Sequence, residues 1–270
     1  MPSISVIVGT YNHLMYLKLS LYSLERQTFK DFEVIIADDG SGPDVGEWIK
    51  TYHPFYPLKH LWQEDKGFRK CRILNRAVRE AKADYLVFMD ADCVLAKDFL
   101  LAHWEKRGDG IFLGGRRVML AKKAALLVTK EMIAKGYFDG VSLWGMFQTL
   151  LGKTSYYEET FRPLYSLRKE SPFSLLGCNF SIHKHDLLFI NGFDEEYESR
   201  GGGEDTDVAL RLKAAGRRMA SVRYLAIQTH LGHEIPEDKS RSAKLFAKKE
   251  KKVKTVEDAK RIKSSLSDKR

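Results

Sequence analysis

Two aspartates, Asp90 and Asp92, flank a single alanine directly after the apolar run Tyr85–Met89. In an extended segment residues i and i+2 point the same way, so both carboxylates face one spot. Such a pair repels unless a cation lies beside it, and Mg²⁺ or Mn²⁺ accepts one or two protein carboxylates together with diphosphate oxygens. The pattern predicts a divalent metal that would neutralise a departing nucleoside diphosphate. The alternative is a solvated turn, or a cap for a helix that begins near Lys97.

A second acid follows another apolar run. Asp39 lies in the segment Asp38-Asp39-Gly40-Ser41, directly after the β-branched run Phe32–Ala37. A carboxylate at this position could accept a hydrogen bond from a nucleotide base N–H or from a ribose hydroxyl. Aspartate and glycine are also ordinary turn residues, so the segment alone leaves both interpretations open.

A third group of acids begins a predicted helix. Three glycines precede Glu204 and Asp205, and the apolar spacing predicts a helix that runs through Leu212 and is closed by Gly216. Acids favour a helix N-terminus because of the helix dipole, and we expect Asp207 to act in that way. Transfer of a group to a hydroxyl also needs a carboxylate that removes the proton, and glycines allow a substrate to approach the backbone closely.

Two histidines, His230 and His233, follow the segment SVRYLAIQ, whose composition is typical of a strand. A lone histidine is more often a core or surface residue than a ligand. Beside an aspartate pair, either one is a candidate third metal ligand. We favour His230, because it comes immediately after the predicted strand.

Basic side chains gather before another predicted helix, Lys70–Lys82, and include Arg69 and Arg72. Guanidinium groups bind diphosphates through paired N–H donors. The same cluster could equally be a solvated basic face, so the sequence leaves both alternatives open.

The elements that must position these residues alternate between strand and helix patterns. Short apolar runs bounded by turns predict strands, and apolar residues at helical spacing predict helices. In chain order they are Ile4–Val8, His13–Arg26, Phe32–Ala37, Lys70–Lys82 and Tyr85–Met89. This β-α-β-α-β order predicts an α/β fold with a doubly wound, mostly parallel sheet flanked by helices. Ligands bind outside the carboxyl ends of the strands in such sheets, so the three strand-end acids should converge on one crevice.

The second half of the sequence shows a less regular pattern of apolar and polar residues. Phe173–His183 is predicted as a strand, Ser155–Ser171 as a charged loop, and Lys122–Leu151 as a helical insertion that mixes lysines with aromatics. We favour helices packed on the sheet for the insertion. The alternative is a membrane-surface face beside a lipid-linked acceptor.

The net charge of +9 is concentrated at the C-terminus. Residues 237–270 hold 13 Lys/Arg and 6 Asp/Glu, a net charge of +7, so a near-neutral body of residues 1–236 carries a basic, partly helical tail. The tail's lysines would suit an anionic membrane. Alternatively, Phe246 and Val253, seven residues apart, dock it on the body or on a partner. Aromatics hardly interleave with the lysines, so we expect no nucleic acid.

Several classes of protein are disfavoured. The chain contains no G-x-G-x-x-G after its first strand and no G-x-x-x-x-G-K-[ST], which argues against dinucleotide enzymes and P-loop NTPases. The three widely spaced cysteines argue against a disulfide scaffold and favour a reducing cytosol. We expect neither a signal peptide nor a spanning helix, because the N-terminus lacks a long apolar region and no run of about 18 apolar residues exists.

Three segments together resemble family 2 glycosyltransferases of the GT-A fold. The first two are SVIVGTYNHLMYLKLSLYSLERQTFKDFEVIIADDGS and DKGFRKCRILNRAVREAKADYLVFMDADC. The third, GCNFSIHKHDLLFINGFDEEYESRGGGEDTDVALRL, is similar to a segment of β-1,4-galactosyltransferases and bacterial chondroitin polymerase. The resemblance covers residues 3 to 233. It implies a nucleotide-sugar half over 1–115, an acceptor half over 116–236 and the tail over 237–270.

The resemblance also implies a role for each matching residue. Those assigned to the donor are Thr10, Tyr11 and Asn12 in the nucleotide pocket, Asp39 at the uracil, Arg69 or Arg72, and Asp90, Ala91 and Asp92 around the ribose, sugar and metal. Those assigned to the acceptor side are Cys178 and Asn179 beside the sugar, Glu204 as the orienting residue and Asp205 as the base. His230 would complete the metal site with Asp92.

The implied activity is metal-dependent, inverting transfer of a hexose or N-acetylhexosamine from a UDP-sugar to a glycan or lipid-linked glycan, with Mn²⁺ or Mg²⁺ as cofactor. A role in bacterial surface polysaccharide or lipopolysaccharide synthesis would follow, in the cytoplasm or peripherally on the inner face of the membrane. The chain departs from the family's W-G-G-E-D motif, since Arg200-Gly201 replace the aromatic, which leaves the acceptor open. Alternatives are a nucleotidyltransferase and a non-catalytic sugar-nucleotide binder.

Overall fold

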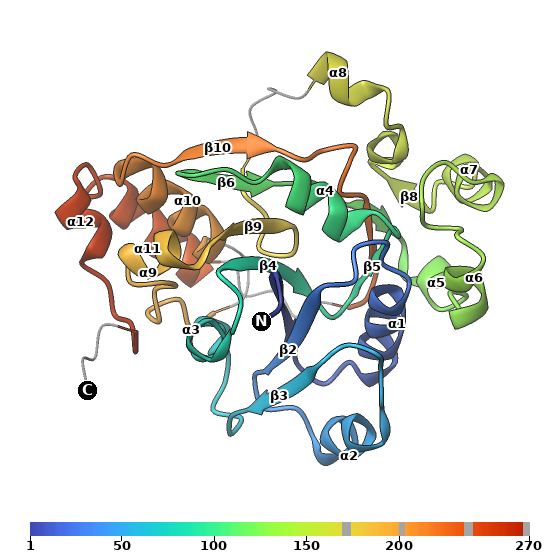
Figure 1. Ribbon diagram of the computed structural model, residues 1–270, viewed down its shortest axis with the longest axis horizontal. Helices are drawn as coiled ribbons and strands as arrows, with labels where there is room; N and C mark the ends of the chain where they lie inside the picture. The colour runs from blue at the N-terminus through green and yellow to red at the C-terminus, as the bar shows by residue number, and fades with distance from the viewer. Residues whose placement is uncertain (169–173, 200–202, 235–239, 267–270) are drawn as a thin grey trace.

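The computed structural model describes residues 1–168, 174–199, 203–234 and 240–266. Its centre is a seven-stranded sheet flanked by helices on both faces (Figure 1). In spatial order its strands are β10 (Arg218–Ser221), β6 (Ile111–Gly114), β9 (Phe180–His183), β4 (Tyr85–Asp90), β1 (Ile4–Thr10), β2 (Phe32–Asp38) and β3 (Leu58–Trp62). The pairs β4–β1–β2–β3 are parallel, and so is β6–β10. Only β9 among these strands runs antiparallel to its neighbours, so the mostly parallel sheet is confirmed.

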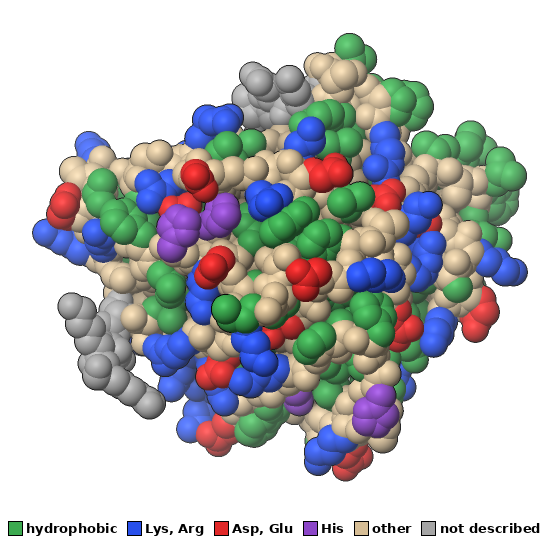
Figure 2. All heavy atoms as spheres, in the orientation of Figure 1, with side chains coloured by type: hydrophobic (Ala, Val, Ile, Leu, Met, Phe, Trp, Pro, Cys, Tyr) green, Lys and Arg blue, Asp and Glu red, His purple; other side chains and the backbone are tan. Residues whose placement is uncertain are grey.

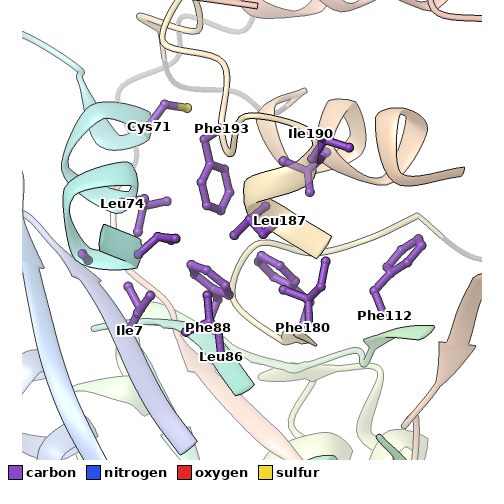
Figure 3. Packing of buried hydrophobic residues seen from close by; sticks show 14 of the residues in the cluster. Ile7, Cys71, Leu74, Leu86, Phe88, Phe112, Phe180, Leu187, Ile190 and Phe193 are labelled. Atoms are coloured by element: carbon purple, nitrogen blue, oxygen red, sulfur yellow. The ribbon is translucent and has the colours of Figure 1, made fainter. Parts of the chain in front are cut away.

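The alternation of side chains along β1 explains the two-sided fold. Ile4, Val6 and Val8 point into one core layer, which they share with helices α1 (Leu14–Glu25) and α2 (Pro43–Thr51). Ile7 points into the other layer, beside α3 (Lys70–Glu80). Every residue of β1 is buried, as expected for a parallel strand covered on both faces. The layer beside α3 holds the stacked rings of Phe88 and Phe180, whose centroids lie 4.3 Å apart (Figure 3).

Helices cover both faces of the sheet and form the ends of the molecule. Those of the first half are α1 (Leu14–Glu25), α2 (Pro43–Thr51), α3 (Lys70–Glu80) and α4 (Phe99–Lys106). Those of the second half are α5 (Lys122–Ala125), α6 (Lys130–Ala134), α7 (Leu143–Leu150), the 3₁₀ turn η1 (Tyr157–Thr160), α8 (Leu164–Arg168), α9 (Lys184–Phe189) and α10 (Glu204–Ala214). None of the described helices has both the length and the apolarity needed to span a membrane.

A second, four-stranded sheet was not predicted. Its order is β5 (Cys93–Leu95), β11 (Gln228–Leu231), β7 (Val118–Leu120) and β8 (Thr154–Ser155). β11 pairs antiparallel with β5, and its His230 lies opposite Cys93, the residue after Asp92. The insertion helices pack on this sheet and on α1 through the small core cluster that contains Leu120 and Leu231. They are therefore helical as expected, but they do not lie on the main sheet.

Three sequence predictions need correction. The strand predicted over Phe173–His183 begins only at Phe180, because residues 177–179 form a turn closed by the Asn179 N–H to Leu176 carbonyl bond; Phe173 itself lies outside the described residues. The strand predicted over residues 221–228 is a connection between two sheets, since the chain turns at Tyr224, whose φ is +64°. The loop predicted over residues 155–171 contains η1 and α8.

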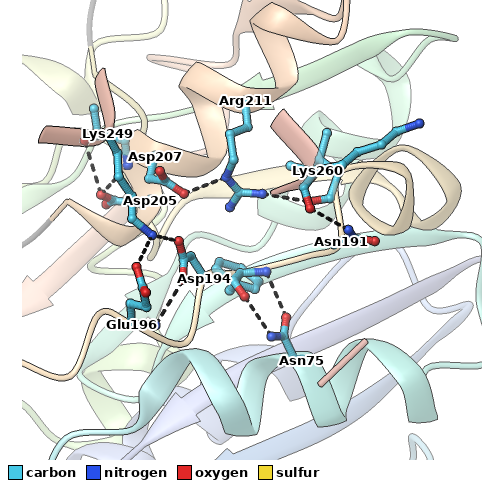
Figure 4. Close-up of polar contacts among 12 residues, drawn as sticks. Asn75, Asn191, Asp194, Glu196, Asp205, Asp207, Arg211, Lys249 and Lys260 are labelled. Atoms are coloured by element: carbon cyan, nitrogen blue, oxygen red, sulfur yellow. Dashed lines mark hydrogen bonds and ion pairs between the residues drawn. The ribbon is translucent and has the colours of Figure 1, made fainter. Parts of the chain in front are cut away.

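The basic tail packs on the body. It forms α11 (Ser240–Glu250) and α12 (Val256–Lys260), which lie beside α10 (Figure 1). Phe246 and Val253 contact the core layer beside α3, in agreement with the docking alternative. Lys249 forms ion pairs with the buried Asp194 and with Glu196 (Figure 4).

Candidate functional site

A cavity of about 410 Å³ opens where β1, β2 and β4 end and the second sheet begins. The carboxyl ends of the parallel strands supply one wall, and β11 supplies the other. Its lining residues are Gly9, Thr10, Tyr11, His13, Asp39, Gly67, Phe68, Lys70, Asp90, Ala91, Asp92, Arg117, His230 and His233. The three strand-end acids therefore do converge on one crevice, as the predicted topology requires.

One cluster in the cavity has the composition of a metal site. The Nε2 atoms of His233 and His230 lie 2.9 and 3.2 Å from Asp92 Oδ2, and the three possible ligand atoms lie within 4.8 Å of one another. Asp92 follows β4, His230 lies in β11 and His233 follows it, so the β5–β11 pairing creates this Asp92–His230–His233 cluster. The sequence favoured His230 alone, and the structure places both histidines at the carboxylate.

The electrostatics of the cluster suit a divalent cation. Burial alone would raise the pKa of Asp92, but hydrogen bonds from the two histidines outweigh it and hold the pKa well below its ordinary value. The carboxylate is therefore ionised and available as a ligand. Nδ1 of His230 is buried and has no hydrogen-bond partner among the described residues. One carboxylate oxygen and two imidazole nitrogens form a donor set that Mn²⁺ accepts, so the residues present fit the predicted metal.

Asp90 forms an ion pair with Lys70, which the sequence assigned only to a cluster of basic residues. Lys70, the first residue of α3, lies with Nζ 2.6 Å from Asp90 Oδ1. Burial would lower the pKa of Lys70, but Asp90 and Glu204 raise it above its ordinary value, so the amine stays charged. Gly9 of β1 leaves the room for this pair, because a Cβ there would lie 3.3 Å from both Asp90 Oδ1 and Lys70 Cε.

The two acids at the end of β2, Asp38 and Asp39, have different environments. Asp38 is fully buried and closes its own turn by accepting from the Ser41 N–H at 2.8 Å. Asp39 lines the cavity and accepts from Gln63 Nε2 at 2.5 Å and from the backbone N–H of Arg69 at 2.8 Å. Burial raises the pKa of Asp39 above its ordinary value. Asp39 is thus the acid of this pair that lines the cavity, and its contact with a base or ribose stays a prediction.

The end of β1 and the two residues after it contribute unequally to the cavity. Thr10 and Tyr11 line it, and the Thr10 hydroxyl is buried without a partner among the described residues. Asn12 has a positive φ of 56°, and its side chain accepts from the Gly42 N–H at 2.8 Å. Asn12 lines a neighbouring cavity instead, so its position indicates a turn residue beside the strand-end cavity.

The predicted arginines lie outside the cavity. The side chains of Arg69 and Arg72 line a separate basic groove with Arg76 and Arg79. The cations that line the cavity are instead Lys70 and Arg117. Arg117 follows β6, and its Nη1 lies 3.2 Å from Cys178 Sγ. Sequence reasoning missed it, although the Gly-Gly-Arg-Arg run marks the end of that strand.

Cys178 and Asn179 are buried and are not among the residues that line the cavity. A hydrogen bond with Cys93 lowers the pKa of Cys178 to about 7. The Asn179 amide donates to the carbonyls of Arg116 and Ala226, and its side-chain oxygen lies 3.0 Å from His103 Nε2. Asn179 therefore ties three segments together, and direct contact of either residue with a sugar stays a prediction.

The two candidate acids of α10, Glu204 and Asp205, are not among the residues that line the cavity, although Glu204 acts electrostatically on the lining residue Lys70. Asp205 Oδ2 accepts from the Gly177 N–H at 2.8 Å, which fixes the carboxylate (Figure 4). Burial, and then the neighbouring Asp205, raise the pKa of Glu204 to about 7, and Glu204 Oε2 has no partner among the described residues. Asp207 forms a fully buried ion pair with Arg211, at 2.6 Å, and is structural. Residues 200–202, which precede these acids, lie outside the described part of the chain.

Comparison with known proteins identifies the family. The profile of glycosyl transferase family 2 matches residues 5–142, just over half of the chain, and the profile described as the N-terminal domain of galactosyltransferase matches residues 162–234. The chain belongs to glycosyl transferase family 2. This family 2 chain is 27% identical to the chondroitin synthase of Escherichia coli over 235 residues, which cover 81% of this chain and 33% of that protein. The resemblance in the sequence is thereby confirmed.

Solved structures confirm the fold of this family 2 chain. S. aureus TarS, residues 1–349 in complex with UDP-GlcNAc, matches with a TM-score of 0.58 and 22% identity, covering 89% of this chain and 61% of that one. The mannosyltransferase PcManGT from Pyrobaculum calidifontis, in complex with GDP-Man and Mn²⁺, matches with a TM-score of 0.57 and 17% identity, covering 97% and 66%. The fold is GT-A, as expected. The family 2 chain spans about a third of the length of the E. coli chondroitin synthase.

Proposed function

We propose that this chain is an inverting glycosyltransferase that moves a hexose or N-acetylhexosamine from a UDP-sugar to a glycan acceptor, with Mn²⁺ or Mg²⁺ as cofactor. The observation that carries the proposal is the convergence of Asp39, Asp90 and the Asp92–His230–His233 cluster on one cavity at the strand ends. The solved relatives support it, because TarS was crystallised with UDP-GlcNAc and PcManGT with GDP-Man and Mn²⁺.

The donor would be held by complementary charge. Lys70 and Arg117 line the cavity and would contact diphosphate oxygens. Asp39 would accept from the uracil N–H, and the unpartnered Thr10 hydroxyl offers one more hydrogen bond. Asp90, fixed by Lys70, would face the ribose or sugar. A cation held by the Asp92–His230–His233 cluster would supply positive charge that stabilises the departing UDP.

The acceptor would be activated by the acids of α10. Asp205, oriented by the Gly177 N–H, would remove the proton from an acceptor hydroxyl while Glu204 orients the sugar. The acceptor oxygen then bonds to the anomeric carbon as the bond to the diphosphate oxygen breaks on the opposite face. One displacement inverts the configuration, so an α-linked donor gives a β-linked product and UDP.

We further propose a glycan or lipid-linked glycan acceptor of the kind used in bacterial surface polysaccharide or lipopolysaccharide synthesis. The similarity to a chondroitin synthase supports a glycan. The cysteines Cys71, Cys93 and Cys178 are free and buried, which fits the reducing, cytoplasmic compartment expected from the sequence.

Thermal unfolding with a ligand panel tests the donor site. The protein is heated with UDP, UDP-sugars, GDP, GDP-mannose, CTP or ATP, each with and without MnCl₂. We expect the melting temperature to rise with UDP and one UDP-sugar, only with metal, because a ligand that binds the folded state stabilises it. Asp92→Ala should abolish the rise. Glu234→Ala removes an exposed carboxylate beside His233 and serves as the matched control.

The rival functions predict different results. A rise with CTP or ATP in place of UDP compounds would indicate a nucleotidyltransferase and overturn the proposal. A rise with a UDP-sugar, but no release of UDP when glycan acceptors are supplied, would indicate a non-catalytic binder. Metal-dependent release of UDP with an acceptor is the result that supports transfer.

A further inference from the structure

Helix α7 turns its apolar side toward solvent. Leu143, Phe147 and Leu150 are 87%, 57% and 84% exposed, and Met146 and Leu151 are exposed with them. These positions follow the i, i+3, i+4, i+7, i+8 spacing that normally marks the buried side of a helix. The buried residues of α7 are instead a glycine and a glutamine, Gly145 and Gln148. The usual orientation of an amphipathic helix is inverted here.

Polar contacts hold α7 in this orientation. The Tyr157 hydroxyl lies against Gly145 so closely that a Cβ there would overlap it, and the same oxygen accepts from the Ser142 N–H at 2.9 Å. The Ser142 hydroxyl caps the helix by accepting from the Gly145 N–H at 3.1 Å. Rotating the leucines inward would break these bonds and drive a larger side chain against the tyrosine. The exposed apolar side is therefore built into the structure.

The exposed apolar surface extends beyond α7. Leu126 and Leu127 after α5, together with Phe161 and Leu167, are also about half exposed or more. Figure 2 shows the apolar side chains gathered over α7 and α8 at the upper right of the view. We call the surface formed by Leu126, Leu127, Leu143, Met146, Phe147, Leu150 and Leu151 the α7 face.

The stretch of chain that carries α7 is rich in lysine. Residues 122–160 contain Lys122, Lys123, Lys130, Lys135 and Lys153. Two of the four acids of this stretch are already engaged, since Asp139 pairs with Arg26 and Glu159 with Arg223. Leucine and phenylalanine flanked by lysine are the side chains that insert beside lipid phosphates.

We propose that the α7 face docks on the surface of an anionic lipid bilayer. The apolar side chains would enter the boundary between headgroups and acyl chains, and the surrounding lysines would contact lipid phosphates. A second copy of the chain fits less well, because a two-fold interface places the same surface on both subunits and would bring the two sets of lysines together. A membrane presents the opposite charge.

The position of the insertion also supports docking on a bilayer, and this part of the support rests on the proposed function. A second cavity, of about 730 Å³, is lined by His13, Tyr16, Lys122 and His233, among others. It shares His13 and His233 with the cavity that contains the Asp92–His230–His233 cluster, and it reaches α5 of the insertion. Docking through the insertion would therefore bring the site near a bilayer, where lipid-linked acceptors reside.

Flotation with lipid vesicles tests the docking proposal and uses no sugar donor. A negative flotation result would therefore count against membrane docking and not against the proposed glycosyl transfer. Vesicles of phosphatidylcholine, with or without phosphatidylglycerol, are mixed with the purified chain and centrifuged. We expect the chain to float with the anionic vesicles, and Leu143→Ser/Leu150→Ser to bind more than about tenfold more weakly, since the variant lacks two apolar side chains that would leave water on docking. Both positions are exposed, so the variant should fold, which its melting temperature checks.

Two controls locate the binding surface. Leu188→Ser removes an exposed leucine of α9, far from α7 (Figure 1), and should float as the unmodified chain does. Lys248→Glu/Lys251→Glu/Lys252→Glu reverses exposed lysines of the tail, at the opposite end of the molecule from the insertion, and should retain most of the binding.

Three results would overturn the proposal. The first is no flotation of the unmodified chain with either vesicle, and the second is equal flotation of the double serine variant. The third is a concentration-dependent dimer in sedimentation velocity that the double serine variant abolishes, which would assign the α7 face to a second copy of the chain.

Discussion

The proposed donor half and the proposed acceptor half of the site are organised differently. In the donor half, Asp39 follows the buried strand β2 and Asp90 ends the buried strand β4, and each already has a partner in Gln63 or Lys70. In the acceptor half, Glu204 and Asp205 begin α10, and a carboxylate oxygen of Glu204 is buried without a partner among the described residues. The two acids of the proposed donor half are fixed by partners, whereas one of the two acids of the proposed acceptor half keeps an oxygen without a partner among the described residues.

This difference indicates separate tasks. Groups fixed by a rigid sheet are suited to hold a ligand in one position. A carboxyl group with a buried, unpartnered oxygen, such as that of Glu204, can bond the hydroxyl of an incoming acceptor and orient it beside the proposed base Asp205. We therefore expect changes in the donor half to affect nucleotide binding, and changes in the acceptor half to affect transfer.

The largest expected effect comes from Asp205→Asn. If Asp205 is the base, transfer should fall by about 10²–10⁴-fold, while metal-dependent UDP binding stays unchanged because Asp205 contacts Gly177 and not the donor half. UDP release gives the rate, and titration calorimetry gives the affinity. Glu158→Gln, at an exposed acid in the same half, should change neither. Normal turnover of Asp205→Asn would remove the assignment and the division of tasks with it.

The second prediction concerns the support of α10. Arg211→Met should lower the free energy of unfolding by about 3–5 kcal/mol, because it leaves the fully buried Asp207 carboxylate unpaired. Urea denaturation measures the loss. Asp207→Asn/Arg211→Met should recover part of it, since the variant buries no charge. If Arg211→Met alone is as stable as the unmodified chain, the acceptor half does not depend on this ion pair (Figure 4).

The same division explains which parts of the fold and the site could be predicted from the sequence. The parallel strands, and the acids at their ends, follow local rules of periodicity and topology, so Asp39, Asp90 and Asp92 could be placed in one cavity from the sequence. The β5–β11 pairing joins segments more than 130 residues apart. It brings His233 to Asp92 as well as His230, and no local pattern reports such a contact.

Side-chain direction was equally hard to predict. Arg69 and Lys70 are adjacent in sequence, yet Lys70 enters the cavity and Arg69 turns into the basic groove, because neighbouring residues at the start of a helix project in different directions. Asn179 lies in a motif associated with the acceptor, but the structure uses its amide to join Arg116 and Ala226. The identity and spacing of the residues predicted which part of the molecule each one lies in, whereas tertiary packing determines which groups each side chain contacts.

The smallest expected effect is a change in the pH dependence of stability. Burial, and then Asp205, raise the pKa of Glu204 from 4.5 to about 7. The folded state therefore binds more protons than the unfolded state between these values, so stability is fully present below about pH 4.5 and is lost as the pH rises through 7. Glu204→Gln cannot ionise and should lack this loss, which is on the order of 1–3 kcal/mol. Melting temperatures between pH 5 and 8 should thus fall less steeply for Glu204→Gln than for the unmodified chain or the exposed control Glu158→Gln. Parallel curves for all three proteins would mean that Glu204 is not an unsatisfied acid, and the contrast between the two halves of the site would not hold.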